Sequence, residues 1–531
     1  MRMKPFPEAS TMGQAPSTGP KFLPMLKSRL AWRYVVCSLI ASYIVYCYVF
    51  SKPLFAHPLP EYSGPYNVGA VDVEAPLPLP RVIDTVRFKG TKENAFELET
   101  VLFTLYYPAA QNAVSRKPKH RWIPKPVSVT AEGYAKFAHI NNFIVNKLFD
   151  RAIGALVGGI EIPAEVDVPL ADLATTVLET PEMHDDNKEI EKVIQITKAG
   201  HPVIVFSHGM ASSRTDYTHY AGELASRGYV VALLEHRDGS CPGSVIMQNG
   251  QPDRVKLTFG IPDVEAVDGR VLSVDEFKRM QLDFREAEIE ETVRVLQLIN
   301  SGRGEEVFRQ NARGEGSDFA NWKDRLNTAE MVVAGHSFGA TGAMQALRGG
   351  PSPRRPFRGA VILDPGKQSG RLNDDVRVPV LVVHSNSWSS RYSLFYGRAH
   401  FDTVRDVVES NVLRGMPSWF ATSLGTSHPS VTDAPLLEPL LLSWTTGAKI
   451  DVHEGLRQYV HVAEDFLWFL TTGEKRSLLA EKAEFPQYDE GSGFGVWKPG
   501  QGDGEGVGEG EGVGGPWADW RRYWQVHVSP N

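Results

Sequence analysis

The stretch MVVAGHSFGATGA, residues 331 to 343, decides the fold that this sequence predicts. Its first half is an apolar run typical of a buried strand, and its small last residues are typical of a helix start. Between them stands Gly-x-Ser-x-Gly, with Ser337 at the centre. The two glycines remove Cβ atoms that would collide in a sharp strand-to-helix turn. We therefore predict that Ser337 is a nucleophile; the alternative is a purely structural turn.

Short β-branched runs recur on both sides of this stretch and alternate with helical stretches. Continuous apolar runs of this kind indicate strands buried on both faces, as in a mainly parallel sheet with crossover helices. The predicted class is α/β, with the α/β-hydrolase fold and its flanking helices. The runs are PVIVFSHG (202 to 209), YVVALLEHRD (229 to 238), GAVILDPG (359 to 366) and VPVLVVHS (378 to 385), and the last predicted helix lies around residues 456 to 470.

In this fold the nucleophile is followed along the chain by an acid and then by a histidine. Asp364 ends an apolar strand, where catalytic groups collect in open α/β sheets, whereas the aspartates at 374 and 375 lie in a polar loop. We predict Asp364 as the acid. His428 lies in a late loop from which its imidazole could reach both Ser337 and Asp364, so it is the predicted base, with His384 as the alternative.

A serine nucleophile also needs two amide donors for the oxyanion of the tetrahedral intermediate. One is predicted to be the backbone N–H of Phe338, directly after the nucleophile. The other is predicted to be the backbone N–H of Met210, in the loop that follows an early strand, with Gly209 permitting the chain to turn. The alternative is that this loop is only a strand end.

Charge and cysteine content exclude several other classes. The formal net charge is -7, so no overall positive field exists to attract nucleic acid, and we expect no nucleic-acid partner. The chain has three cysteines, and only Cys241 lies outside the apolar N-terminal segment. A disulfide within the globular part and a cysteine-rich zinc site are therefore excluded.

The run from 34 to 50 contains no charged residue and lies between Arg33 and Lys52. We predict a transmembrane anchor over residues 34 to 55; a cleaved signal peptide and a buried core helix are the alternatives. Basic residues precede the run, which predicts a cytosolic N-terminus and a single-pass protein of a secretory-pathway membrane.

Composition divides the rest of the chain. We expect a disordered basic N-terminus (1–33), the anchor (34–55), a Pro-rich extended connector (56–85), the catalytic domain (86–485), a Gly/Glu-rich linker (486–515) and an aromatic C-terminal tail (516–531). The tail contains Trp517, Trp520, Tyr523 and Trp524. It is expected to dock on the domain, with contact to lipid headgroups as the alternative.

An ordered set of motifs resembles the platelet-activating-factor acetylhydrolase family. The motifs are LYYPAA (105 to 110), WIP (122 to 124), FSHGM (206 to 210), LEHRDGS (234 to 240), GHSFGAT (335 to 341) and GTSHPS (425 to 430). The resemblance implies the triad Ser337, Asp364 and His428, and calcium-independent hydrolysis of a short or oxidised acyl chain at the sn-2 position of a phospholipid. Neither a metal nor an organic cofactor is expected.

Two other functions are compatible with the sequence. One is a general carboxylesterase or lipase of the same fold, with a different pocket. The other is a catalytically silent, membrane-anchored binding protein. The expected partners are a phospholipid substrate and a membrane, and the residues do not specify a protein partner.

Overall fold

The computed structural model describes residues 23–49, 56–172, 200–439, 445–490 and 520–531. It divides into two units, Met1–Leu54 and Phe55–Asn531. The described part of the first unit is one helix, α1 (Leu23–Val49). The predicted disordered N-terminus as far as residue 22, and most of the predicted Gly/Glu-rich linker, lie outside the described residues.

Helix α1 contains most of the segment predicted as a membrane anchor. Its uncharged part begins after Arg33, and Lys27 and Arg29 stand in the preceding turns. A spanning helix needs about 20 predominantly apolar residues. Across the described ranges, no helix is both long enough and apolar enough to cross a membrane. The prediction of a transmembrane helix over 34–55 is therefore not supported.

The second unit is built on a ten-stranded sheet. Its central strands are the apolar runs seen in the sequence, where β-branched residues favour the extended backbone. The strands, in their order across the sheet, are β16 (Trp524–Val528), β15 (Ser418–Ser423), β12 (Val380–Ser385), β11 (Phe357–Leu363), β10 (Leu326–His336), β5 (His201–Ser207), β6 (Val230–Glu235), β3 (Glu97–Pro108), β1 (Val68–Val82) and β4 (Glu165–Val166).

Six neighbouring strands, from β15 to β6, run parallel. Strand β16 is antiparallel to β15 at one side, and β3 is antiparallel to both β6 and β1 at the other. The expected mainly parallel sheet is confirmed, and its arrangement fits an α/β-hydrolase. The carboxyl ends of the six parallel strands share one edge, so the loops that follow them lie close together.

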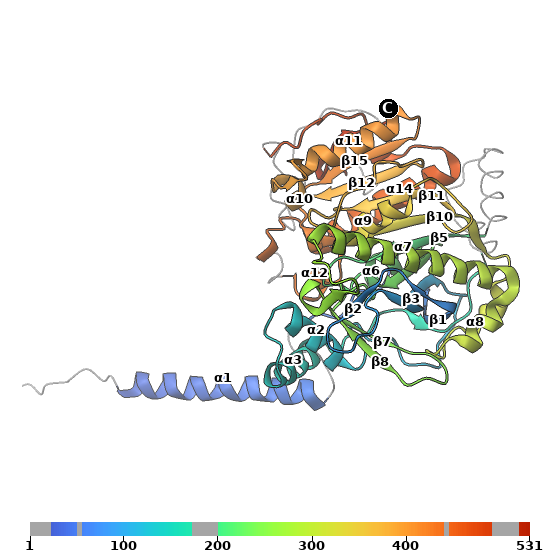
Figure 1. Ribbon diagram of the computed structural model, residues 1–531. Coiled ribbons are helices and arrows are strands. Elements are labelled where there is room, and N and C mark those ends of the chain that lie inside the picture. Colours follow the sequence, from blue (N-terminus) through green and yellow to red (C-terminus); the bar gives the residue numbers. More distant parts are fainter. Residues whose placement is uncertain (1–22, 50–55, 173–199, 440–444, 491–519) are drawn as a thin grey trace, which may run out of the picture. The chain divides into compact units, whose positions relative to one another are not determined.

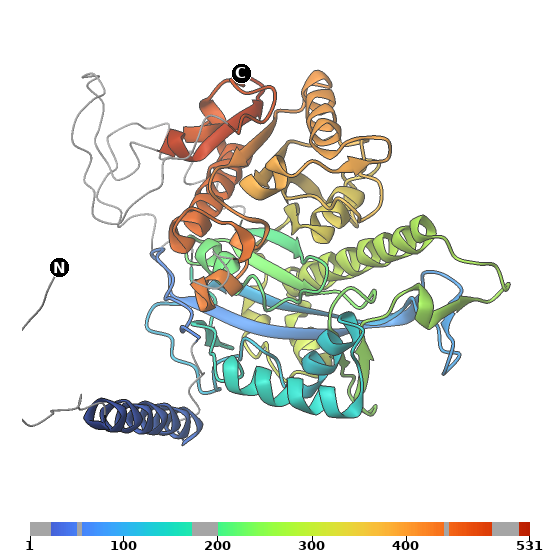
Figure 2. The same ribbon diagram turned by 90° about the vertical axis from the view of Figure 1, so that its left-hand side faces the viewer.

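Helices cover both faces of the sheet, because alternate residues of each strand point to opposite sides. Val333 of β10 packs in the same cluster as helices α7, α9 and α11, whereas Val332 packs with α6 and α14. Figures 1 and 2 show strands of the sheet between α7 on one side and α14 on the other. The core therefore has two apolar layers, one on each side of the sheet.

The remaining elements complete the unit. The helices are α2 (Val127–Phe137), α3 (Phe143–Leu156), α6 (Thr218–Ala225), α7 (Val274–Leu298), α8 (Gly304–Gln310), α9 (Phe338–Ala346), α10 (Asn386–Ser390), α11 (His400–Leu413), α12 (Ala434–Leu437), α14 (Val452–Thr472) and α15 (Ser477–Ala480). Three two-stranded sheets pair β2 (Val86–Phe88) with β9 (Val264–Ala266), β7 (Gly243–Ile246) with β8 (Arg254–Leu257), and β13 (Leu394–Phe395) with β14 (Arg398–Ala399).

The stretch 56–85, predicted as a connector, belongs to the domain. Its residues from Val68 to Val82 form β1, which pairs with β3 along its length. The prolines obscured this strand in the sequence. The register of the pairing shifts between Pro76 and Arg81, where a proline cannot donate a ladder hydrogen bond.

The C-terminal tail also contributes a strand. Residues Trp524–Val528 form β16 on the outer edge of β15, after a turn of 3-10 helix, η5 (Trp520–Tyr523). Trp524 is buried, and its Nε1 atom donates to Oε1 of Gln458 at 3.0 Å. The described part of the tail is thus docked on the domain, and Trp517 lies outside the described residues.

Candidate active site

Ser337 occupies the turn between β10 and α9. Its backbone has φ 56° and ψ -120°, a combination that non-glycine residues rarely adopt. A Cβ atom on Gly335 would lie 2.3 Å from the carbonyl oxygen of Gly339, and a Cβ on Gly339 would lie 1.9 Å from that of Ser207. Both glycines are therefore required by close packing, and the sharp turn presents Ser337 at the N-terminus of α9.

Asp364 directly follows β11, the strand next to β10. It is 2% exposed, and its carboxylate accepts hydrogen bonds from the backbone N–H of Ser385 at 2.6 Å and from the Ser385 hydroxyl at 2.7 Å. A third bond comes from Nδ1 of His428, 2.8 Å from Oδ2. Three donors compensate the buried negative charge, so the carboxylate can hold the imidazole in one orientation.

His428 begins the short helix η4 (His428–Val431), after the loop that follows β15. Because Nδ1 donates to Asp364, the tautomer of the neutral ring leaves Nε2 free to accept a proton. The His428 backbone N–H donates to the Ser387 hydroxyl at 2.9 Å, and the ring stacks on Trp388. The side chain is 30% exposed, so a substrate can reach it.

The contact between the Ser337 segment and this pair is made by His336, the residue before Ser337. The ring of His336 lies 4.4 Å from that of His428, measured between centroids. His336 is fully enclosed, and burial, followed by the nearby His428, lowers its pKa well below the usual range. It therefore stays neutral at physiological pH, and it adds no charge beside the His428 imidazole.

The two predicted oxyanion donors belong to segments next to Ser337. A Cβ on Gly209 would lie 3.2 Å from the Ser337 Cβ, which places Gly209 against Ser337. Within the described ranges the Met210 N–H has no acceptor. Phe338 is the first residue of α9, and the N–H groups of a first turn have no partner within the helix. Both amides are thus available to a ligand.

The residues considered as alternatives lie elsewhere. His384 is buried in an aromatic group with His400 and Phe420, and its Nδ1 atom contacts the Ser389 hydroxyl at 3.2 Å. Burial lowers the pKa of His384 well below its usual value. Of the two loop aspartates, Asp375 pairs with Arg377 at the surface. None of these contacts connects an alternative residue to Ser337.

A metal could be held at one place in the described part of the chain. Ligand atoms of His336, Asp364 and His428 lie within 4.8 Å of one another. However, Nδ1 of His428 already bonds Asp364, and Nδ1 of His336 bonds the hydroxyl of Tyr217 at 2.8 Å. Both of these bonds engage Nδ1, so they hold the two rings in place as members of one hydrogen-bonded polar group.

Two residues of this site were not anticipated from the sequence. Ser385 ends the VPVLVVHS strand, and its position beside the strand that carries Asp364 was a usable signal. Trp388 stands in the following helix, α10, and nothing in its sequence surroundings indicates that it stacks on His428. Its contact depends on the approach of two loops that are 40 residues apart in the chain.

Comparison with known families decides the relationship. A family model described as "Platelet-activating factor acetylhydrolase, isoform II" matches residues 55–475, about four-fifths of the chain. The chain belongs to this family. The resemblance inferred from the motifs is thus confirmed, and the range shared with the platelet-activating factor acetylhydrolase family includes Ser337, Asp364 and His428. It ends before β16.

Individual members of known sequence share between about a quarter and a third of their residues with this chain over the aligned ranges. A platelet-activating factor acetylhydrolase from Cavia porcellus is 26% identical over 311 residues, which cover 58% of this chain and 55% of the relative. One from Gallus gallus is 31% identical over 198 residues (35% and 44%). A putative phospholipase A2 from Schizosaccharomyces pombe is 27% identical over 294 residues (53% and 57%). The chain spans about half the length of the curated relatives it matches.

Proposed function

We propose that this member of the platelet-activating factor acetylhydrolase family is a serine-dependent, calcium-independent phospholipase. Its substrates are phospholipids that resemble platelet-activating factor, with an acetyl, short or oxidised acyl chain at sn-2. The observation that carries the proposal is the hydrogen bond between Asp364 and His428 beside the strained turn at Ser337. The names of the relatives support the choice of substrate.

In the first half of the proposed reaction, Nε2 of His428 takes the proton of the Ser337 hydroxyl while Oγ attacks the sn-2 carbonyl carbon. The carbonyl oxygen becomes an oxyanion, which the N–H groups of Met210 and Phe338 stabilise. The intermediate then collapses: the ester C–O bond breaks, and the lysophospholipid oxygen leaves with the proton from His428. The acyl group stays on Ser337.

In the second half, water attacks the acyl-enzyme. His428 takes a proton from the water as its oxygen bonds the acyl carbon, and it returns a proton to Oγ of Ser337 as the acyl–enzyme bond breaks. The products are a short carboxylic acid and the free enzyme. Since side chains supply both the nucleophile and the proton transfer, the proposed chemistry requires no calcium ion.

The exposed apolar side chains of α3 support the proposal that the enzyme acts on lipids in a membrane or another aggregate. Phe143, Ile144 and Leu148 are 77%, 75% and 65% exposed, and none of the α3 residues is buried. An amphipathic helix that leaves its apolar side chains uncovered is suited to the boundary between headgroups and acyl chains. Action at a membrane surface, with the active site in the secretory pathway, is part of the proposal.

The test is turnover on phosphatidylcholines that differ only in sn-2 chain length, from acetyl to oleoyl, with and without EDTA. We expect the fastest release from the shortest chains and no effect of EDTA. Fastest release from long chains would indicate a general lipase. A protein without turnover that also resists a fluorophosphonate probe would be a binding protein.

A further inference from the structure

The four residues at the end of β6 and directly after it, Glu235 to Asp238, all carry charged or ionisable side chains, and all are at least 97% buried. Burying such groups is costly unless each has a partner, so their partners show what the segment holds in place. Glu235 and His236 contact the segment from Ser207 to Arg214 directly, and Asp238 does so through Arg285. This loop contains Met210, the proposed oxyanion donor.

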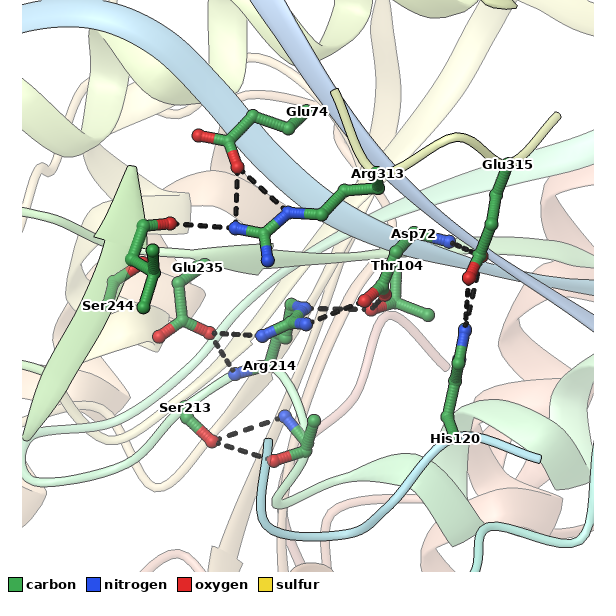
Figure 3. A network of polar contacts seen from close by, with 12 residues as sticks. Asp72, Glu74, Thr104, His120, Ser213, Arg214, Glu235, Ser244, Arg313 and Glu315 are labelled. Atoms are coloured by element: carbon green, nitrogen blue, oxygen red, sulfur yellow. Dashed lines mark hydrogen bonds and ion pairs between the residues drawn. The ribbon is translucent and has the colours of Figure 1, made fainter. Parts of the chain in front are cut away.

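Glu235 fixes the far end of the loop. Its Oε2 atom accepts hydrogen bonds from the backbone N–H of Arg214 at 3.1 Å and from the Arg214 guanidinium at 3.3 Å. The same guanidinium donates to Asp72 of β1 at 2.8 Å and to Thr104 of β3 at 3.0 Å, as Figure 3 shows. The Arg214 end of the loop is therefore tied to three neighbouring strands.

His236 fixes the near end of the loop. Its Nε2 atom lies 2.7 Å from the Ser207 hydroxyl, and its Nδ1 atom lies 2.6 Å from Oε2 of Glu288 in α7. Its backbone N–H donates to Nε2 of His208 at 3.1 Å. Although hydrogen bonds link a serine, a histidine and a glutamate as in a catalytic triad, all three side chains are buried, so no substrate reaches Ser207.

The protonation of this pair suits a positioning role. Burial lowers the pKa of His236 well below its usual range and raises the pKa of Glu288 to about 8. The pair therefore holds one proton near neutral pH and is neutral overall. A neutral pair costs less to bury than separate charges, and it keeps a hydrogen bond on Ser207 across the physiological range.

Asp238 acts through Arg285 of α7. Nε of Arg285 donates to Asp238 at 2.8 Å, and Nη1 donates to the carbonyl oxygen of His208 at 2.7 Å and to the Ser207 hydroxyl at 3.1 Å. The guanidinium also lies 4.3 Å from the centroid of the Phe338 ring. Arg285 thus touches the residues that precede one proposed donor and the side chain of the other.

We propose that the side chains of Glu235, His236, Asp238 and Arg285 form an oxyanion frame, which positions the N–H groups of Met210 and Phe338. This inference rests on the proposed function. The frame residues do not touch substrate; they are positioning residues. They hold the loop on both sides of Met210, and Arg285 connects it to Phe338. The buried EHRD motif thereby gains a role in the reaction.

The first test is the variant Arg285→Lys, which keeps a positive charge opposite Asp238 but cannot reproduce the planar fork of hydrogen bonds. The control is Arg237→Lys. Arg237 is also buried and lies between the frame residues His236 and Asp238. Its side chain, however, pairs with Glu74, Thr100 and Ser244, away from the loop. Both variants lose a buried guanidinium, so a general loss of stability affects both.

For Arg285→Lys we expect kcat on a dissolved short-chain ester to fall by about ten- to a hundredfold with KM nearly unchanged, since deleting one oxyanion donor costs about 10²–10³. The preference for an oxoester over its thionoester should fall as well, because sulfur is a weaker hydrogen-bond acceptor. Arg237→Lys should keep both values. Equal losses of kcat in the two variants would overturn the frame.

A second pair leaves no buried charge without a partner. Ser207→Ala removes the hydroxyl shared by His236 and Arg285, whereas Ser244→Ala removes a buried hydroxyl that accepts a hydrogen bond from Arg237. Hydrogen–deuterium exchange of residues 207–214 should quicken in Ser207→Ala and not in Ser244→Ala. Unchanged exchange in Ser207→Ala would contradict the oxyanion frame, whether or not the wild-type chain is active. Inactivity of the wild-type chain, by itself, would contradict only the proposed function.

Discussion

The indole ring of Trp388 stacks on the imidazole of His428, with ring centroids 3.9 Å apart and 10° between the planes. The Nε1 atom of Trp388 donates to the carbonyl oxygen of Pro365 at 3.0 Å, one residue after Asp364. One side chain thus contacts the proposed base and the loop of the proposed acid. Through these two contacts Trp388 restricts the orientation of the His428 ring.

The Trp388 contact leads to the first prediction. Trp388→Leu removes the stacking surface and should lower kcat by about tenfold, because a misoriented base loses much of its contribution of about 10²–10⁴. Trp388→Phe keeps an aromatic face and should retain most of the rate. The measurement is kcat on a soluble ester, with melting temperature as the control; a Leu variant with full kcat would show that the stack is unimportant.

Ser337→Ala tests the nucleophile. The variant should fold, since alanine is smaller than serine, and it should lose turnover by several orders of magnitude, as removal of a triad nucleophile does. It should also lose labelling by a fluorophosphonate probe. Labelling that survives would assign the reaction to another serine.

The base is tested by comparing two histidines. His428→Ala should lower kcat almost as far as the serine variant, because members of a triad act as a unit. His384→Ala should have a much smaller effect on kcat, since His384 contacts Ser389 and not Asp364. It should instead reduce stability, because it empties a buried site. A reversed ranking in kcat would transfer the role of base to His384.

Buried histidines should make the fold sensitive to acid. Burial lowers the pKa of His208 and His400 to about 3 and that of His527 to about 4. Below about pH 6.5 the unfolded chain binds protons at these rings and the folded chain does not, so stability falls by about 1.4 kcal/mol per pH unit for each ring. The loss should extend down to the folded pKa values.

Buried carboxyl groups oppose this trend. Burial raises the pKa of Asp433 to about 6 and that of Asp216 to about 7, so the folded chain binds more protons there. Buried histidines with a lowered pKa are more numerous than Asp433, Asp216 and Glu288. Besides the three rings above, they include His201, His219, His236, His336 and His384. The melting temperature should therefore fall from about pH 7 to about pH 5.

One variant isolates a single ring. His527→Gln should make the melting temperature less dependent on pH in this interval, because it removes one buried ring whose pKa burial lowers. A melting temperature that rises on acidification would show that the carboxyl groups dominate.

The C-terminal strand should be needed for stability. Deleting residues 520–531 removes the buried Trp524, Val526 and Val528, each worth about 1.5–3 kcal/mol at most when fully buried. It also uncovers the edge of β15, which favours association between chains. We expect a lower melting temperature and aggregation on heating. Arg521→Ala, which removes the ion pair that this exposed side chain forms with Glu481, should change neither.

Much of the fold could be predicted because the local pattern and the fold agree. Apolar runs became parallel strands, and the Gly-x-Ser-x-Gly context placed Ser337 at a strand-to-helix turn. Chain order and the strand ends then indicated Asp364 and His428, which the structure brings into contact. Their catalytic roles stay predictions.

Contacts between distant segments could not be predicted. Asp238 and Arg285 are 47 residues apart, and Glu235 and Arg214 are 21 apart, so no local periodicity relates them. Prolines disguised β1 as a connector, and the short aromatic run of β16 lacked a strand signal of its own. At the N-terminus, the uncharged run alone suggested a membrane anchor, although the helix that contains it does not meet the requirements for spanning.

The position of β16 in the chain affects how the protein is made. Its partner β15 ends at Ser423, and β16 starts at Trp524, so the ribosome adds 100 residues, 424 to 523, between the two. At about 5–20 residues per second, the outer edge of β15 waits many seconds for the strand that covers it. During that interval the nascent domain presents the open edge of β15 to neighbouring polypeptides. A chaperone that binds the nascent chain would act in this interval.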